Sequence, residues 1–204
     1  MNKLIFILCI YFMCKTPSIS QSIEIMPGAE RIFVDVQFLE FFDQDLRWSL
    51  FSRSRATSSY TDSKTDLFTG SYMNYTSRFG FGGTILGRIS SNGGGIDAGI
   101  HFFKSSKSFM IYALTSININ DELLYSWFSI FRYTPLISEK WKGYLSIELF
   151  SAFAKVGHLS SVQRLRIGAE SGGYQFGLAL NLQASGTSLN EVDSNPGIFI
   201  RKAF

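Results

Sequence analysis

Residues 174–183 read Tyr-Gln-Phe-Gly-Leu-Ala-Leu-Asn-Leu-Gln, and their strict alternation decides the fold class. Successive side chains of an extended strand point to opposite faces, so one face here carries Tyr174, Phe176 and three leucines. The other face carries two glutamines, an asparagine and two small residues. A strand with its apolar face against lipid and its polar face toward a lumen has this pattern.

Similar stretches, rich in aromatic, β-branched and glycine residues, recur between short polar turns. We expect strands at 31–40, 46–55, 67–78, 80–90, 96–104, 108–119, 122–133, 141–153, 160–170, 174–183 and 198–204. The glycines and asparagine that chain reversals require lie between them, as in 91–95 and 171–173. The sequence therefore predicts an all-β fold, an antiparallel transmembrane β-barrel of about 10–12 strands with meander topology.

The number of expected strands is odd, whereas single-chain bacterial barrels usually have an even number. We expect a twelfth, short strand within 56–66 or 189–194. The alternative is a barrel of about ten strands, in which two of the expected segments are not strands.

A soluble β-sandwich would show the same period of two, because one face of each of its sheets packs on a core. Aromatic residues near many strand ends, such as Trp48, Trp127 and Trp141, instead favour a membrane barrel with interfacial girdles. The expected strands also have about the length that a tilted strand needs to cross hydrocarbon. The aromatic residue at the end of the chain, Phe204, is the third observation in favour of the barrel.

Residues 196–204 form an alternating segment in which Ile198 and Ile200 precede the terminal Phe204. This segment resembles the C-terminal signal by which outer-membrane barrels are recognised for assembly, although Lys202 stands where a second outward aromatic is common. The chain as a whole resembles small outer-membrane β-barrel proteins of Gram-negative bacteria. The resemblance implies contact with outer-membrane lipid and with the barrel-assembly machinery through the last strand. It leaves open whether the barrel is part of a larger envelope complex.

The first 20 residues have the three parts of an export signal: a positive start at Lys3, an apolar stretch over 4–13, and a small-residue tail at 18–20. We expect a cleaved secretory signal peptide at 1–20 and a single outer-membrane barrel domain at 21–204. Both cysteines, Cys9 and Cys14, lie in the signal, so the mature chain would have no disulfide.

Removal of the signal would take away two lysines and no acidic residue, so the net charge would fall from +3 to +1, which is 3 minus 2. A chain with so little excess charge gives no indication of a nucleic-acid partner.

Charged residues fall on the polar face of the expected strands. By parity the following side chains face the lumen: Arg53, Arg55, Arg88, Asp97, Arg132, Glu148, Arg164, Arg166 and Arg201, with Asp35 and Glu170 as further acidic residues. In a narrow interior they would form a network that plugs the barrel, and in a wider one they would line a path for small polar or anionic solutes. Phe51, Phe103 and Phe199 share the polar face, where they would line a pocket for an acyl chain or fill gaps.

Catalytic chemistry has few candidate residues, because the chain has only two histidines, His101 and His158. No short-range ligand spacing suggests a metal site, and we expect neither a metal nor a cofactor. His158 and Ser160 would share one face of a strand, where an imidazole can activate a hydroxyl. This His-x-Ser arrangement is similar to that of outer-membrane phospholipase A, which implies Ser160 as nucleophile and His158 as base. The competing interpretation is a polar turn over 157–161 that leads into a strand.

The sequence thus favours a barrel without catalytic activity that has a structural, binding or small-solute pore role in the outer membrane. One alternative is an outer-membrane lipid-active enzyme that uses His158 and Ser160. The other is a periplasmic or secreted β-sandwich that binds a ligand.

Overall fold

The structure is a computed structural model that describes residues 20–62, 64–91, 93–119, 124–187 and 191–204. The expected export signal up to residue 19, with both cysteines, lies outside the described residues. In the described part of the chain, no helix has the length and apolar character needed to cross a membrane.

Twelve strands make up the described chain. They are β1 (Ser20–Pro27), β2 (Arg31–Phe41), β3 (Trp48–Ser59), β4 (Thr65–Thr76), β5 (Phe81–Ser90), β6 (Gly93–Ser105), β7 (Phe109–Asn118), β8 (Tyr125–Tyr133), β9 (Lys142–Ala154), β10 (Gly157–Ser171), β11 (Tyr174–Ser185) and β12 (Glu191–Ala203).

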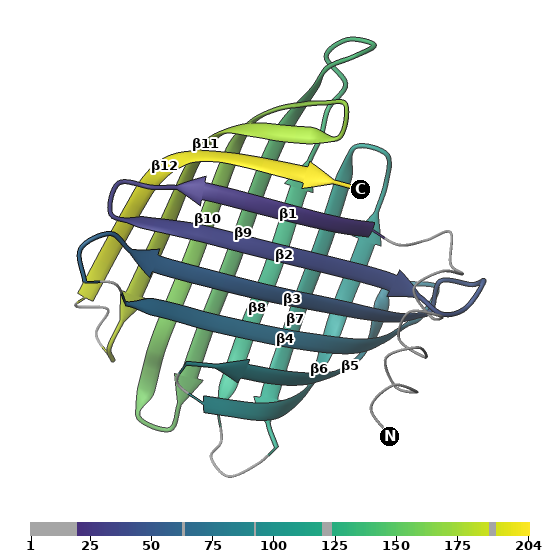
Figure 1. The fold of residues 1–204 in the computed structure, drawn as a ribbon. Helices are drawn as coiled ribbons and strands as arrows, with labels where there is room; N and C mark the ends of the chain where they lie inside the picture. Colours follow the sequence, from purple (N-terminus) through teal and green to yellow (C-terminus); the bar gives the residue numbers. More distant parts are fainter. Residues whose placement is uncertain (1–19, 63, 92, 120–123, 188–190) are drawn as a thin grey trace, which may run out of the picture.

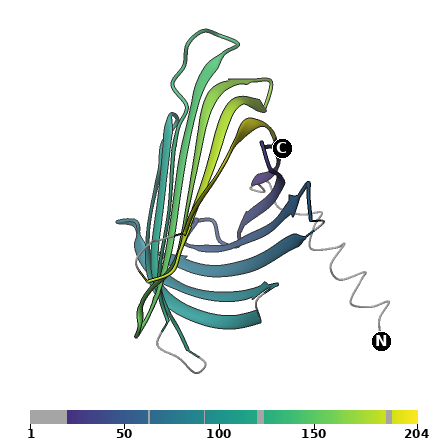
Figure 2. The same cartoon turned by 90° about the vertical axis from the view of Figure 1, so that its left-hand side faces the viewer.

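Each strand pairs antiparallel with its neighbours in the chain, and β1 pairs with β12 to close the sheet into a barrel. Figure 1 shows β1–β4 in front, with β7–β10 crossing behind them. The side view shows these two walls facing each other across the interior (Figure 2). The predicted all-β antiparallel barrel with meander topology is confirmed, with twelve strands.

All eleven expected strands are present, but the prediction for the twelfth was wrong. Of the expected positions, residues 56–59, 65–66 and 191–194 instead belong to the ends of β3, β4 and β12. The missing strand is β1, which places Ile23 and Ile25 outside and Ser22 and Glu24 inside. Its alternation is short and ends at Pro27, and its start coincides with the end of the expected signal peptide, so its sequence pattern is weak.

The outer face of the barrel is a continuous apolar belt. The register places Ile167, Leu178 and Ile198 side by side on β10, β11 and β12, and these side chains are 53%, 70% and 60% exposed. A soluble protein rarely exposes such a contiguous apolar surface, whereas a barrel in lipid requires it.

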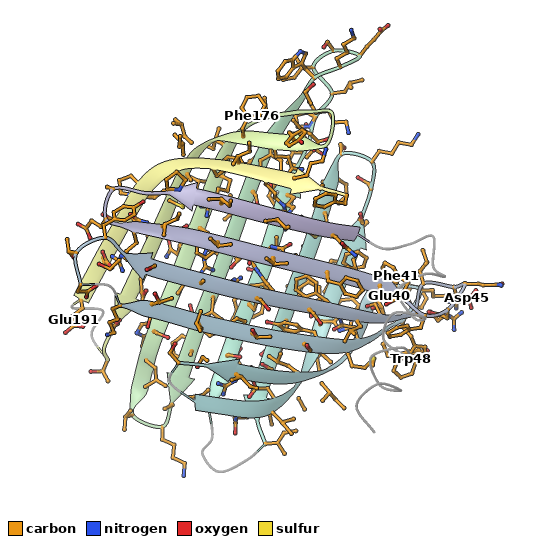
Figure 3. All side chains as sticks on the ribbon, viewed as in Figure 1. Glu40, Phe41, Asp45, Trp48, Phe176 and Glu191 are labelled. Carbon is orange, nitrogen blue, oxygen red and sulfur yellow. The ribbon has the colours of Figure 1, made fainter. Side chains whose placement is uncertain are left out.

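Aromatic pairs mark both ends of the barrel. We call the end where β1 begins and β12 finishes the terminal end, and the other the far end. Trp48 contacts Tyr75 at the terminal end, and Tyr125 contacts Phe153 at the far end, with ring centroids 5.0 and 6.1 Å apart. Figure 3 shows Trp48 at the terminal end and Glu191 at the far end. Such pairs match the aromatic girdles of membrane barrels.

Two apolar clusters fill part of the interior. The first joins β4, β5, β7 and β8 through Tyr72, Leu86, Tyr112, Leu114, Phe128 and Ile130, and the second joins β1, β2, β9, β11 and β12 through Met26, Phe33, Tyr144, Ala179 and Phe199. The rings of Tyr72 on β4 and Phe128 on β8 stack with centroids 6.3 Å apart. Side chains therefore reach from one wall to the other.

A pair of lysine substitutions tests whether the apolar belt contacts lipid. Leu178 and Val192 are 70% and 69% exposed on adjacent strands, but Val192 lies near the far end of β12. In lipid vesicles we expect Leu178→Lys to lower the free energy of unfolding by about 2–4 kcal/mol, and Val192→Lys by at most about 1 kcal/mol, because the cost depends on depth. Denaturant unfolding in vesicles measures both, and equal small losses would show that the belt does not lie in hydrocarbon.

Candidate functional site

The charged residues that parity assigned to the lumen all lie inside the barrel. Nine of them are Arg53, Arg55, Arg88, Asp97, Arg132, Glu148, Arg164, Arg166 and Arg201. The further acidic residues Asp35 and Glu170 share the inner face with the buried Glu24 and Gln175 opposite them. Arg88 and Asp97 form a local pair between β5 and β6, in which Arg88 Nε donates to Asp97 Oδ2 at 2.7 Å. The other seven of these nine gather near mid-height, together with Glu24, Asp35 and Gln37. We call this set of ten residues the central network.

Arg53 joins opposite walls of the barrel. Its guanidinium donates to both carboxylate oxygens of Asp35 on the neighbouring β2, at 2.6 and 2.9 Å. Its Nη1 also donates to Glu148 Oε2 at 2.6 Å. Glu148 lies on β9, which is six strands from β3 in either direction around the barrel, so this bond spans the lumen. Charge-assisted bonds of this kind are the strong ones, and Arg53 itself is almost fully buried.

Glu148 is the acceptor on which three arginines converge. Arg55 on β3 and Arg164 on β10 bind its Oε1, while Arg53 binds its Oε2. Arg55 also lies 3.4 Å from Asp35 Oδ1. Each wall of the lumen therefore carries its own acid and base: Asp35 with two arginines on one side, and Glu148 with Arg164 on the other.

The central network contains more positive than negative charge. Six arginines meet three carboxylates, those of Glu24, Asp35 and Glu148. In the part of the chain that the structure describes, Arg132 and Arg201 form no ion pair. Both instead donate to Gln37 Oε1, at 2.8 and 3.0 Å. A neutral amide oxygen does not balance two cations inside the barrel, so this region attracts anions.

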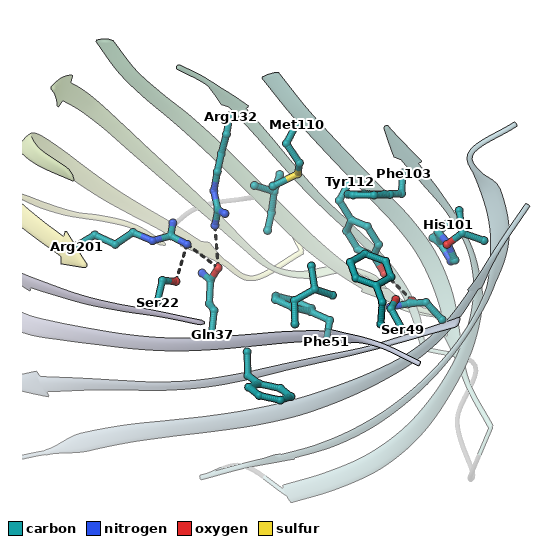
Figure 4. A pocket seen from close by; sticks show the side chains of 16 residues that line it. Ser22, Gln37, Ser49, Phe51, His101, Phe103, Met110, Tyr112, Arg132 and Arg201 are labelled. Atoms are coloured by element: carbon teal, nitrogen blue, oxygen red, sulfur yellow. Dashed lines mark hydrogen bonds between the residues drawn. The ribbon is translucent and has the colours of Figure 1, made fainter. Parts of the chain in front are cut away.

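Cavities of different size lie along the lumen. One of about 90 Å³ opens toward the terminal end, and another of about 40 Å³ lies toward the far end between β2, β3 and β10–β12. Figure 4 shows the larger one. Between them, the central network leaves only about 20 Å³. A water molecule needs a cavity of roughly 10–15 Å³, so the constriction has room for about one water.

The structure places His158 beside Ser161 and not beside Ser160. A β-bulge between His158 and Ser160 shifts the register of β10 against β9, which differs from the shared face expected for these two residues. His158 Nε2 lies 2.7 Å from Ser161 Oγ, and Nδ1 lies 2.9 Å from the backbone oxygen of Gly186. That oxygen can only accept, so Nδ1 carries a hydrogen, and in the neutral ring Ser161 donates to Nε2.

His101, the other histidine, is buried and held by two threonine hydroxyls. Its ring nitrogens lie 2.8 Å from Thr76 Oγ1 and 2.8 Å from Thr84 Oγ1. Among the described residues, no group of three or more histidine, cysteine or acidic side chains is arranged to hold a metal ion.

Two members of the central network were missing from the sequence-based assignment of charged residues. Glu24 lies on the missed strand β1 and accepts from Arg166 at 2.8 Å. Gln37 is uncharged and was not among the residues assigned to the lumen, although its amide joins two arginines and Asp35. Their only sequence signal is alternation with apolar residues: Glu24 lies between Ile23 and Ile25, and Gln37 lies between Val36 and Phe38.

No protein-family model matches the sequence, and no curated protein matches it. Several solved structures match the fold. One is described as a KdgM porin in complex with disordered oligogalacturonate, with a TM-score of 0.53 at 7% identity, over 91% of this chain and 99% of that one. A NanC porin in a rhombohedral crystal form gives a TM-score of 0.53 at 9% identity, over 92% and 99% of the two chains. The chain is thus a small barrel with the fold of outer-membrane porins.

Proposed function

We propose that this protein is an outer-membrane barrel that passes small anionic solutes through a constricted lumen, without catalysis. The observation that carries the proposal is the excess of arginine over carboxylate in the central network, at the narrowest point of the barrel. Fixed positive charge in a low-dielectric channel raises the local concentration of anions and discourages cations.

The proposed location rests on three features. Residues 1–20 have the sequence pattern of an export signal, the barrel carries a continuous apolar belt, and its fold is that of porins. In this proposal the assembly machinery recognises the last strand with Phe204, whose side chain is exposed. The terminal end then faces the periplasm, as is usual for bacterial barrels.

The constriction can open because each of its two walls has both a carboxylate and an arginine. When Arg53 and Arg55 release Glu148, both remain beside Asp35 on their own side of the barrel. Glu148 remains paired with Arg164 on the opposite side. No carboxylate loses its last partner, so the open arrangement avoids the large cost of an isolated buried charge. The arginines on both walls then line the path of the anion.

The same cross-lumen bonds favour a competing role, in which the barrel stays closed and acts as a structural or binding protein. In that case the bonds from Arg53 and Arg55 to Glu148 serve only to hold opposite walls together. Conductance separates the two roles.

Planar-bilayer recordings test the pore. We expect a small conductance whose reversal potential in a salt gradient shows preference for anions. Glu148→Gln should raise both the conductance and the anion preference, because it removes the acceptor that holds the bridge across the lumen. Glu191→Gln, the same change at the far end, should behave as wild type. Absence of conductance at any voltage, for both the wild type and Glu148→Gln, would show a closed barrel.

Fractionation of the host tests the location. We expect the protein in the outer-membrane fraction, with a gel migration that changes on boiling, because a closed hydrogen-bonded barrel stays folded in detergent until it is heated. Recovery in the soluble periplasmic fraction, without a change on boiling, would contradict the membrane proposal.

A second candidate function is lipid hydrolysis on the outer face, and one observation favours it. Ser161 Oγ is within hydrogen-bond distance of both His158 and Ser151 Oγ, and the backbone oxygen of Gly186 orients the ring. A hydroxyl activated by an oriented imidazole is a nucleophile for acyl transfer. Ser151 lies on the same face of β9 as Leu149, which belongs to the apolar belt.

Matched serine variants test this second candidate. Ser161→Ala should abolish phospholipid hydrolysis, whereas Ser160→Ala should leave it unchanged, because only Ser161 contacts the imidazole. The assay is release of fatty acid from phospholipid vesicles by the purified protein. This function would be ruled out if the Ser161→Ala variant still hydrolysed phospholipid. It would also be ruled out if the wild type showed no hydrolysis.

A further inference from the structure

The larger cavity, at the terminal end, combines an apolar wall with a cationic inner end. Its wall consists of side chains from five strands, among them Phe41, Phe51, Phe103, Met110 and Ile130. Its mouth is formed by the last residues of β2 and β4 and the first residues of β3. Figure 4 shows the aromatic side chains on one side of the cavity and two arginines at the other. We call it the terminal cavity.

The two arginines at the inner end are Arg132 and Arg201, and both have a free hydrogen-bond donor. Arg201 is 6% exposed, yet its Nε has no hydrogen-bond partner among the described residues, and neither has Nε of Arg132. Their remaining bonds go to neutral groups. Gln37 Oε1 accepts from both, and Arg201 also donates to Ser22 Oγ at 2.7 Å and to the Tyr144 hydroxyl at 3.2 Å.

Buried donors without partners, on cations without counter-ions, are costly for a protein to maintain. A carboxylate at the inner end would supply both the missing acceptors and the missing negative charge. Arginine binds carboxylate with charge-assisted bonds that are about twice as strong as neutral ones. The polar part of the ligand is thereby defined.

The walls and the volume define the rest of the ligand. A cavity of about 150 Å³ accommodates the six carbons of benzene, which corresponds to roughly 25 Å³ for each carbon. By that measure the terminal cavity, of about 90 Å³, holds an apolar tail of about four carbons. A longer acyl chain would extend through the mouth at the terminal end.

We infer that the terminal cavity binds a short-chain carboxylate, with its acid group on Arg132 and Arg201 and its alkyl tail against the aromatic wall. The inference does not depend on conduction through the constriction, because the cavity opens at the terminal end and the central network closes its inner side.

Equilibrium dialysis of pentanoate against the full barrel in lipid nanodiscs tests the inference. We expect saturable binding of pentanoate. Acetate, which lacks the alkyl tail, and the neutral pentanamide, which lacks the charge, should each bind more weakly by about tenfold or more. Dodecanoate serves as the probe for a lipid-derived acid. If dodecanoate binds more tightly than pentanoate, the carboxylate ligand comes from membrane lipid. If pentanoate binds more tightly, the ligand is a soluble metabolite.

Arginine variants identify the residues that bind the acid group. Arg132→Gln and Arg201→Gln should each weaken pentanoate binding by about tenfold, which is the effect of losing one hydrogen bond to a charged group. Arg88→Gln is the matched control, because Arg88 is paired with Asp97 and does not line the terminal cavity. Gel migration with and without boiling verifies that each variant is folded, and either of the two variants suffices if the other does not fold.

Three results would overturn the inference: no saturable binding of pentanoate, equal binding of pentanamide, or equal weakening by Arg88→Gln. A barrel that binds pentanoate but does not conduct would contradict the proposed pore and leave this inference intact.

Discussion

The pairing of β1 with β12 is the constraint on which the rest of the structure depends. It leaves none of the twelve described strands with an unpaired edge, and a backbone in lipid has no water to bind in place of a missing neighbour. Closure with twelve strands fixes a narrow interior, and the period of two then sends every second side chain into it. The apolar belt, the interior clusters and the central network all follow from this division into two faces.

The interior combines apolar filling with buried charge, and the two have different consequences. Aromatic contacts such as Tyr72 with Phe128 support the walls without setting a preference for any solute. Ion pairs stabilise less than their number suggests, because desolvation offsets much of the attraction. What the arginines of the central network do provide is a positive potential at the narrowest point, with Gln37 as the neutral link between two of them.

Alternation along single strands carries most of the information that could be obtained from the sequence. It indicated eleven strands and put residues such as Arg53 and Glu148 on the inner face, where the structure places them. It could not show that these two side chains meet, because parity gives the face of a strand and not the residue opposite. The bulge beside His158 was equally inaccessible, since one extra residue in a strand leaves no mark on composition. Strand β1 was missed because its alternation is short and ends at a proline.

The bond between Arg53 and Glu148 joins residues 95 positions apart, and that between Arg166 and Glu24 joins residues 142 positions apart. Neither contact can form within a single hairpin. The contact between Arg166 and Glu24 also requires β1 to lie beside β12. We therefore expect the arginines to remain hydrated throughout hairpin assembly and to lose water only as the sheet closes. Since contacts between distant parts of a chain form slowly, expulsion of water from the lumen would be among the latest steps of folding.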